Sequence, residues 1–173
     1  HRTGLPLLFP HREELYELPF DWDRLPFEIN RVQANFTKKE FFDSLKKYEF
    51  DTVPRSQTLY SNAGTNLTGY LLENIYEQSF EEILQDKVFS PLNMNNTTIS
   101  LSQVDTSILA KGRNENKIEM PYRVEKEMNA EGGIISSVDD MIKYLDYHLN
   151  STSTVVEQAH ERILSDDVAE YHQ

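Results

Sequence analysis

The stretch "LYSNAGTNLTGYLLENIY", residues 59–76, decides the fold, because it reads as an amphipathic helix entered through a Tyr-x-Asn triplet. The apolar residues after the triplet recur at helical spacing, which predicts a helix over about 62–76. The predicted apolar stripe consists of Leu67, Tyr70, Leu71 and Ile75. Tyr60 and Asn62 therefore lie at the N-terminal end of this helix, with the phenol and the carboxamide two positions apart in the sequence.

Further helices are predicted on both sides of this stretch. Thr37 to Glu40 and Ser79 to Glu82 match the capping box, in which a hydroxyl and a carboxylate satisfy free amides at a helix start. These boxes predict helices over about 38–49 and 79–88, the second ended by Ser90-Pro91. Ser137 is expected to cap a helix whose Met141, Ile142, Leu145 and Leu149 share a face, and a last amphipathic stretch covers 155–164.

The remaining segments lack helical period. Prolines at 6, 10, 19 and 26 favour an extended wrapping segment over residues 1–36, followed by a helical part over 37–173. The polar stretch between about 93 and 129 is expected to carry a short strand or two. Gly132-Gly133 is interpreted as a positive-φ turn. With no repeat and no clear linker, residues 1–173 are interpreted as a single domain of mainly α structure with minor β.

Composition excludes several classes of function. The 173 residues carry 17 basic and 29 acidic side chains, a net charge of −12, so the chain would repel a nucleic-acid backbone. With no cysteine it has no thiol nucleophile, zinc–thiolate site or disulfide. No apolar run is long enough to predict a transmembrane helix. The histidines form neither a His-x-x-x-His nor a His-Glu-x-x-His pair, so no metal or other cofactor is expected, and His148 and His160 are interpreted as helix-surface or satisfied core residues.

Four blocks, taken together, resemble one family. They are "HRTGLP" at 1–6, "YSNAG" with the following "TGYLLE" at 60–73, "FSPLNMNNT" at 89–97 and "GGIISSVDDMIKYL" at 132–145. In this order they resemble the serine β-lactamase-like hydrolases, in the branch that contains class C β-lactamases, D-Ala-D-Ala carboxypeptidases and related esterases. The resemblance implies the helical subdomain of the β-lactamase/transpeptidase-like fold, without its flanking α/β sheet, and an extracytoplasmic location in the periplasm or cell envelope.

The same resemblance implies roles for two residues. In the family, the tyrosine of the triplet assists proton transfer with the lysine of a Ser-x-x-Lys motif, and the asparagine contacts the substrate amide. These positions are Tyr60 as the catalytic residue and Asn62 as the substrate-binding residue. A tyrosine that acts as a base near neutral pH needs about 4 kcal/mol of anion stabilisation, which nearby cations must largely supply.

The chain departs from the family pattern at its other catalytic motifs. Neither the family's Ser-x-x-Lys nor its Lys-Thr-Gly or His-x-Gly motif is found at the expected place, and Ser44-Leu45-Lys46-Lys47 matches Ser-x-x-Lys in letters only. We therefore expect a fragment of a serine hydrolase for β-lactam, D-Ala-D-Ala peptide or ester substrates that is inactive alone.

Other interpretations of the same residues remain open. A second interpretation of the chain is a non-catalytic helical interaction module on the same scaffold. Tyr60 is then a packed loop aromatic and Asn62 a helix cap. Acidic pairs such as Asp139-Asp140 are interpreted as solvated charges at helix starts. Apolar surface left uncovered in a subdomain predicts self-association.

Overall fold

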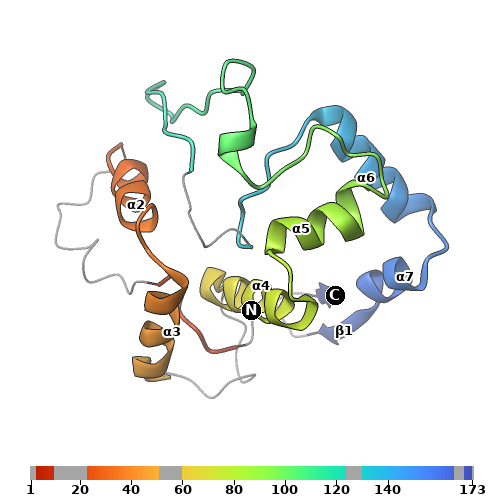
Figure 1. The fold of residues 1–173 in the computed structure, drawn as a ribbon, viewed down its shortest axis with the longest axis horizontal. Coiled ribbons are helices and arrows are strands. Elements are labelled where there is room, and N and C mark those ends of the chain that lie inside the picture. The colour runs from red at the N-terminus through yellow and green to blue at the C-terminus, as the bar shows by residue number, and fades with distance from the viewer. Residues whose placement is uncertain (1–2, 10–22, 51–59, 124–129, 166–169, 173) are drawn as a thin grey trace. The chain divides into compact units, whose positions relative to one another are not determined.

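The computed structural model describes residues 3–9, 23–50, 60–123, 130–165 and 170–172 (Figure 1). The chain forms two compact units. The first is drawn from residues 1–84 and 98–135, and the second from 85–97 and 136–173. Whether the chain acts as the single domain expected from the sequence stays a prediction.

The first unit is built from helices. They are α2 (Leu25–Gln33), α3 (Lys38–Lys47), α4 (Asn62–Tyr76), α5 (Phe80–Leu84) and the short 3-10 helix η2 (Leu101–Gln103). In place of the strand or two expected after residue 93, the described part of this unit has two isolated bridges, Thr98 with Ile135 and Arg113 with Glu119.

The second unit adds the minor β content. It contains the π-helix η1 (Gln85–Phe89), α6 (Val138–Asn150) and α7 (Thr154–His160). Strands β1 (Arg162–Ser165) and β2 (Glu170–His172) form an antiparallel pair, the only sheet within the described ranges. The prediction of a mainly α fold with minor β is therefore confirmed, and no flanking α/β sheet occurs in the part of the chain that is described.

Aromatic side chains make the core of the first unit. Phe41 of α3 is fully buried and meets Phe9 and Tyr70 edge to face, with ring centroids 5.3 Å and 5.1 Å away. Such pairs contribute about 0.5–1.5 kcal/mol each beyond the area that they bury. The rest of the buried cluster is Leu5, Phe36 and Ala63. The extended residues 3–9 are thus held against α3 and α4.

Both capping boxes form as predicted. The Thr37 hydroxyl accepts a hydrogen bond from the Glu40 amide at 3.2 Å, and the Glu40 carboxylate accepts one from the Thr37 amide at 2.8 Å. Ser79 and Glu82 repeat this arrangement at 3.3 Å and 2.8 Å. Local chemistry therefore sets where α3 and α5 begin.

Two predicted segments differ in the structure. Residues 25–33, expected to be extended, form α2, because Pro26 lies in the first turn, where a helix needs no amide donor. Residues 162–164, expected to continue the last helix, belong to β1, because they pair with β2. A short apolar pattern does not distinguish a helix from a strand when the pairing partner decides.

The buried face of α4 also differs from the predicted stripe. Tyr70 is buried, but Leu71 and Ile75 are 54% and 70% exposed. Small residues and one asparagine are buried instead: Ala63, Gly64, Asn66 and Gly69. A Cβ at Gly69 would lie 2.7 Å from the Cβ of Ala130, so this face of α4 is approached too closely for a larger side chain.

Asn66 is an unusual residue for such a face. Its side chain lines a pocket of about 330 Å³, and its fully buried Nδ2 has no hydrogen-bond acceptor among the described residues. We expect Asn66→Leu to raise the free energy of unfolding by about 1 kcal/mol, because it removes an unsatisfied buried donor. Urea denaturation checks this. A comparable fall in stability would mean that the amide is satisfied by water in the pocket.

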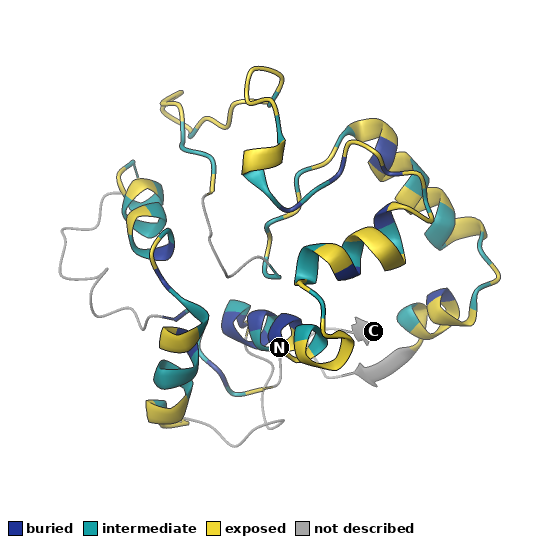
Figure 2. Cartoon of the chain, in the orientation of Figure 1, coloured by how far each residue is buried: buried dark blue, intermediate teal, exposed yellow. Residues whose placement is uncertain are grey.

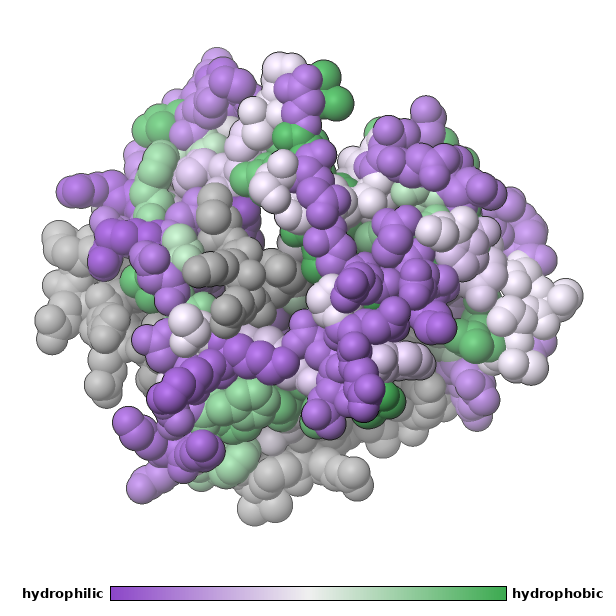
Figure 3. Space-filling view, viewed as in Figure 1, coloured by the Kyte–Doolittle hydropathy of each residue, from purple (hydrophilic) through white to green (hydrophobic). Residues whose placement is uncertain are grey.

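The helix α6 keeps its apolar stripe exposed. Met141, Ile142, Leu145 and Leu149 share a face as predicted, yet each is 46–70% exposed (Figure 2). Hydrophilic side chains predominate on the face seen in Figure 3, in keeping with the strongly acidic composition. Self-association through exposed apolar surface stays a prediction.

Candidate active site

The Tyr60–Asn62 triplet enters α4 through one extended residue. Ser61 is the N-cap, with φ −144° and ψ 108°. Tyr60 is 63% exposed, Ser61 is 1% exposed and Asn62 is half-buried. The phenol is therefore open to solvent at the start of α4, and the serine side chain is turned into the protein.

Two hydrogen bonds hold the side chain of Ser61, the middle residue of the triplet. Its Oγ accepts a hydrogen bond from the Gly64 amide at 2.9 Å and donates one to the Pro6 carbonyl at 2.7 Å. Ser61 is therefore the N-cap of α4. The alternative in which Asn62 caps the helix is wrong, because Ser61 occupies that position.

The backbone amides at the start of α4 also donate hydrogen bonds within the protein. The Asn62 and Ala63 amides donate to the Leu7 carbonyl at 2.9 Å and 3.3 Å. Together with the Gly64 amide bound by Ser61, these donors are consumed by the protein itself. The start of α4 thus offers a ligand its side chains and not its amides, and residues 3–9 fix their position.

We expect Ser61→Ala to lower the free energy of unfolding by about 1–2 kcal/mol, because it removes an N-cap and leaves the Pro6 carbonyl without its donor. Chemical denaturation measures the change. Thr68→Ala, at an exposed position of the same helix, is the matched control and should stay within about 0.5 kcal/mol of wild type. Equal effects of the two substitutions would contradict the anchoring role.

Ser44, the serine of the Ser-x-x-Lys match, lies away from the triplet. Ser44 and Lys47 are on α3, whose buried side chain is Phe41. Ser44 is half-buried and Lys47 is exposed in the last turn. The Ser44-x-x-Lys47 match thus lies on a helix that buries Phe41 and leaves Lys47 exposed.

Several lysine and arginine side chains of the first unit form ion pairs with carboxylates. Lys38 Nζ lies 2.6 Å from a Glu73 carboxylate oxygen and 4.7 Å from the centroid of the Tyr70 ring. Further pairs are Arg31 with Glu28, Lys39 with Asp43, and Lys111 with Glu119. An ion-paired lysine stabilises an additional anion less than a free one does, because its charge is already matched.

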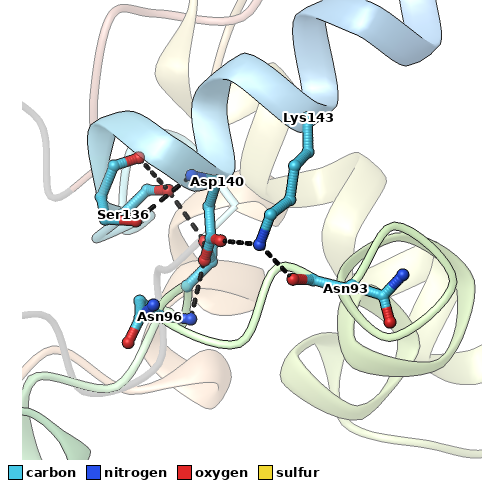
Figure 4. Close-up of polar contacts among 7 residues, drawn as sticks. Asn93, Asn96, Ser136, Asp140 and Lys143 are labelled. Atoms are coloured by element: carbon cyan, nitrogen blue, oxygen red, sulfur yellow. Dashed lines mark hydrogen bonds and ion pairs between the residues drawn. The ribbon is translucent and has the colours of Figure 1, made fainter.

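The second unit holds a buried carboxylate that sequence reasoning missed. Asp140 is 0% exposed and accepts hydrogen bonds from the Asn96 amide at 2.7 Å, the Thr97 hydroxyl at 2.9 Å and Lys143 Nζ at 2.7 Å (Figure 4). Lys143 also donates to the Asn93 carbonyl at 2.5 Å. Asp140 therefore joins the "FSPLNMNNT" block to the start of α6.

The electrostatics of Asp140 are set by these partners. Burial alone would raise its pKa, but the hydrogen bonds from Lys143, Asn96 and Thr97 outweigh burial and hold the pKa below its usual value. The interpretation of Asp139-Asp140 as a solvated pair is thus wrong for Asp140, while Asp139 is exposed. An acidic residue three positions after a cap is common on helix surfaces, so nothing local marks its burial.

The positive φ predicted for the Gly132-Gly133 turn before α6 is found at its first residue, Gly132. Gly132 has φ +154°, which a side chain rarely adopts. A Cβ at this position would lie 3.3 Å from Nη1 of Arg123. The turn is accounted for by backbone geometry.

Within the described ranges no group of three or more histidine, cysteine or acidic side chains is arranged to hold a metal ion. None of the helices described there has the length and hydrophobicity needed to span a bilayer.

Comparison with known proteins identifies the family. The beta-lactamase family model matches residues 1–171. The chain belongs to the beta-lactamase family. Its curated relatives include a beta-lactamase from Pseudomonas fluorescens, 32% identical over 57% of this chain and 27% of the relative. An unguisins hydrolase from Aspergillus campestris is 25% identical over 83% of this chain and 26% of the relative.

Solved structures agree on the fold. A beta-lactamase/D-alanine carboxypeptidase from Pseudomonas syringae aligns with a TM-score of 0.64 at 18% identity, over 92% of this chain and 50% of that one. A class C beta-lactamase from Rhodobacter sphaeroides aligns with a TM-score of 0.59 at 22% identity, over 72% of this chain and 37% of that one. The resemblance inferred from the four blocks is confirmed for family and fold.

The chain spans about a quarter of the length of the curated relatives that it matches, 27% and 26% for the first two. The family that the chain matches consists of serine hydrolase-like enzymes.

Proposed function

We propose that this chain supplies one lip of the cleft of a serine hydrolase that acts through an acyl-enzyme. The observation that carries the proposal is the triplet at the start of α4, in which Tyr60 is exposed, Asn62 begins the helix and the Ser61 side chain between them is buried and hydrogen-bonded to Pro6. Membership of the beta-lactamase family supports the reaction class. The substrate is a β-lactam, a D-Ala-D-Ala peptide or an ester.

The two residues have different roles in this proposal. Tyr60 relays the proton between the nucleophilic serine and the leaving group, and the exposure of its side chain supports this role. Asn62 orients the substrate by hydrogen bonds to its amide. Because its backbone amide is already bound to the Leu7 carbonyl, Asn62 contributes through its carboxamide.

The nucleophile and the cation are supplied from outside these 173 residues. Ser61 has its hydroxyl engaged by Pro6, and Ser44 lies on a surface helix, so neither is an activated serine. Lys38 is paired with Glu73 and is not offered as the catalytic cation. We therefore propose that the chain alone forms no acyl-enzyme. From the family resemblance we also propose that the complete enzyme works outside the cytoplasm.

Asn62→Ala in a protein that includes this segment tests the substrate-binding role. Steady-state kinetics with a penicillin, a D-Ala-D-Ala peptide and a p-nitrophenyl ester should show kcat/KM falling about 10-fold or more for amide-containing substrates, since a site that hydrogen-bonds its substrate loses affinity without that bond. The ester, which offers no amide, should lose less. An equal loss for all three substrates would contradict the assigned contact.

The alternative function remains a helical interaction module without catalysis. The exposed stripe on α6 is the feature that favours it. Asn62→Ala distinguishes the two, because a module without catalysis has no turnover for the substitution to change.

A further inference from the structure

Two histidines that are far apart in sequence meet in the second unit. His148 lies in the last turn of α6, and His160 is the last residue of α7. Nδ1 of His148 and Nε2 of His160 are 3.1 Å apart, and the ring centroids are 5.2 Å apart with a tilt of 36°. His160 is exposed and His148 is half-buried, so both rings can be reached from solvent.

The separation of the two nitrogens fits a shared metal ion. With bonds of about 2.0–2.1 Å, two imidazole nitrogens on one ion lie about 3.3–3.4 Å apart in tetrahedral geometry and about 2.9 Å apart at a right angle. The observed 3.1 Å falls between these values. In the structure the two nitrogens share a hydrogen bond, and a metal ion bound between them would take the place of the shared proton.

The surroundings position one ring and favour a cation. The Tyr144 and Tyr147 rings pack against His148 with centroids 4.5 Å and 5.7 Å away, which restrains its orientation. The site lies at the carboxyl end of the thirteen-residue helix α6, where the helix dipole is negative. The chain as a whole carries a net charge of −12, which also attracts cations.

We propose that His148 and His160 form a two-histidine site for a first-row divalent ion that prefers imidazole, such as Zn²⁺ or Cu²⁺. Water completes the coordination, because no third side-chain ligand of the usual kind joins them among the described residues. The bound ion cross-links the C-terminal end of α6 to the C-terminal end of α7. No spacing motif marks this pair in the sequence, because the two ligands are twelve positions apart and lie on two helices.

Titration of the full 173-residue chain with ZnCl₂ and with CuCl₂ tests the proposal, followed by calorimetry and thermal unfolding. We expect His148→Gln and His160→Gln each to weaken the binding of one ion by about tenfold or more, since even second-shell partners of a metal are worth 10–100-fold in affinity. The ion should raise the unfolding temperature of wild type and not of these variants. Glu157→Gln, at an exposed position of α7 outside any cluster of metal-ligating side chains among the described residues, is the control.

A second readout does not depend on how well the variants fold. Cu²⁺ bound to the wild-type chain should broaden the NMR signals of Tyr144, Tyr147 and His148 before those of other residues, because paramagnetic broadening falls steeply with distance. Binding that is unchanged in both glutamine variants, or broadening that begins elsewhere in the chain, would overturn the proposal.

Discussion

Replacing Asp140 with alanine is expected to lower the free energy of unfolding by about 3–5 kcal/mol, the cost of breaking a buried charge-paired network. The substitution removes the acceptor of three hydrogen bonds, from the Asn96 amide, the Thr97 hydroxyl and Lys143 Nζ. Thr97 is itself only 6% exposed, so its hydroxyl cannot turn to water without rearrangement. Of the hydrogen bonds described between residues 93–97 and α6, only the one from Lys143 to the Asn93 carbonyl would remain.

Urea denaturation followed by circular dichroism measures this change. Asp139→Ala is the matched control, because Asp139 is the exposed neighbour in the same first turn and should cost no more than about 0.5 kcal/mol. If Asp140→Ala were as mild as Asp139→Ala, the network would not be what holds the two segments together.

The same carboxylate predicts a pH dependence. Because the pKa of Asp140 is lowered in the folded chain, its contribution is present above the unfolded pKa and is lost as the pH falls through the lower, folded value. We expect the stability difference between wild type and Asp140→Asn to shrink as the pH is taken below about 4. A difference that stays constant over this range would contradict the assigned ionisation.

Tyr60→Phe is the second substitution with a large expected effect, here on activity. In a hydrolase that includes this segment, kcat/KM should fall by about 10²–10⁴-fold, the usual contribution of a positioned proton-transfer group. The free energy of unfolding should change by no more than about 0.5 kcal/mol, because the phenol is 63% exposed. Loss of rate without loss of stability is the signature of a catalytic role.

Tyr76→Phe provides the control for this measurement. Tyr76 is another exposed tyrosine on α4, at the end opposite to the triplet, and its loss should leave the rate unchanged. Tyr60→Phe with a normal rate would assign the proton transfer to another group. A matching loss of stability would favour the interpretation of Tyr60 as a packed loop aromatic.

Local sequence signals predicted where α3, α4 and α5 begin. The two capping boxes are formed by side chains that bond to amides within three residues, which needs no knowledge of the rest of the fold, and apolar spacing gave the range 62–76 for α4. The helix expected over 79–88 is α-helical only to Leu84 and continues as the π-helix η1. The family resemblance rested on blocks of residues that the structure joins in pairs. Residues 3–7 contact the start of α4, and residues 93–97 contact α6.

Features that depend on distant partners were not predictable in this way. The burial of Asp140 requires Asn96 and Thr97, more than forty positions earlier. The exposure of Leu71 and Ile75 follows from the close approach of Ala130 to the opposite, small-residue side of α4. The His148–His160 pair requires two helices to meet at their ends. In each case the deciding contact is tertiary.

The most direct test of the central claim is covalent labelling of the 173-residue chain and of a hydrolase that includes it. Both are incubated with a fluorescent penicillin and with a fluorophosphonate, and the adducts are mapped by mass spectrometry. The account predicts an adduct on the larger protein at a serine outside residues 1–173, and none on the chain alone. A stoichiometric adduct on a serine within the chain, with Ser44 the first to examine, would contradict it.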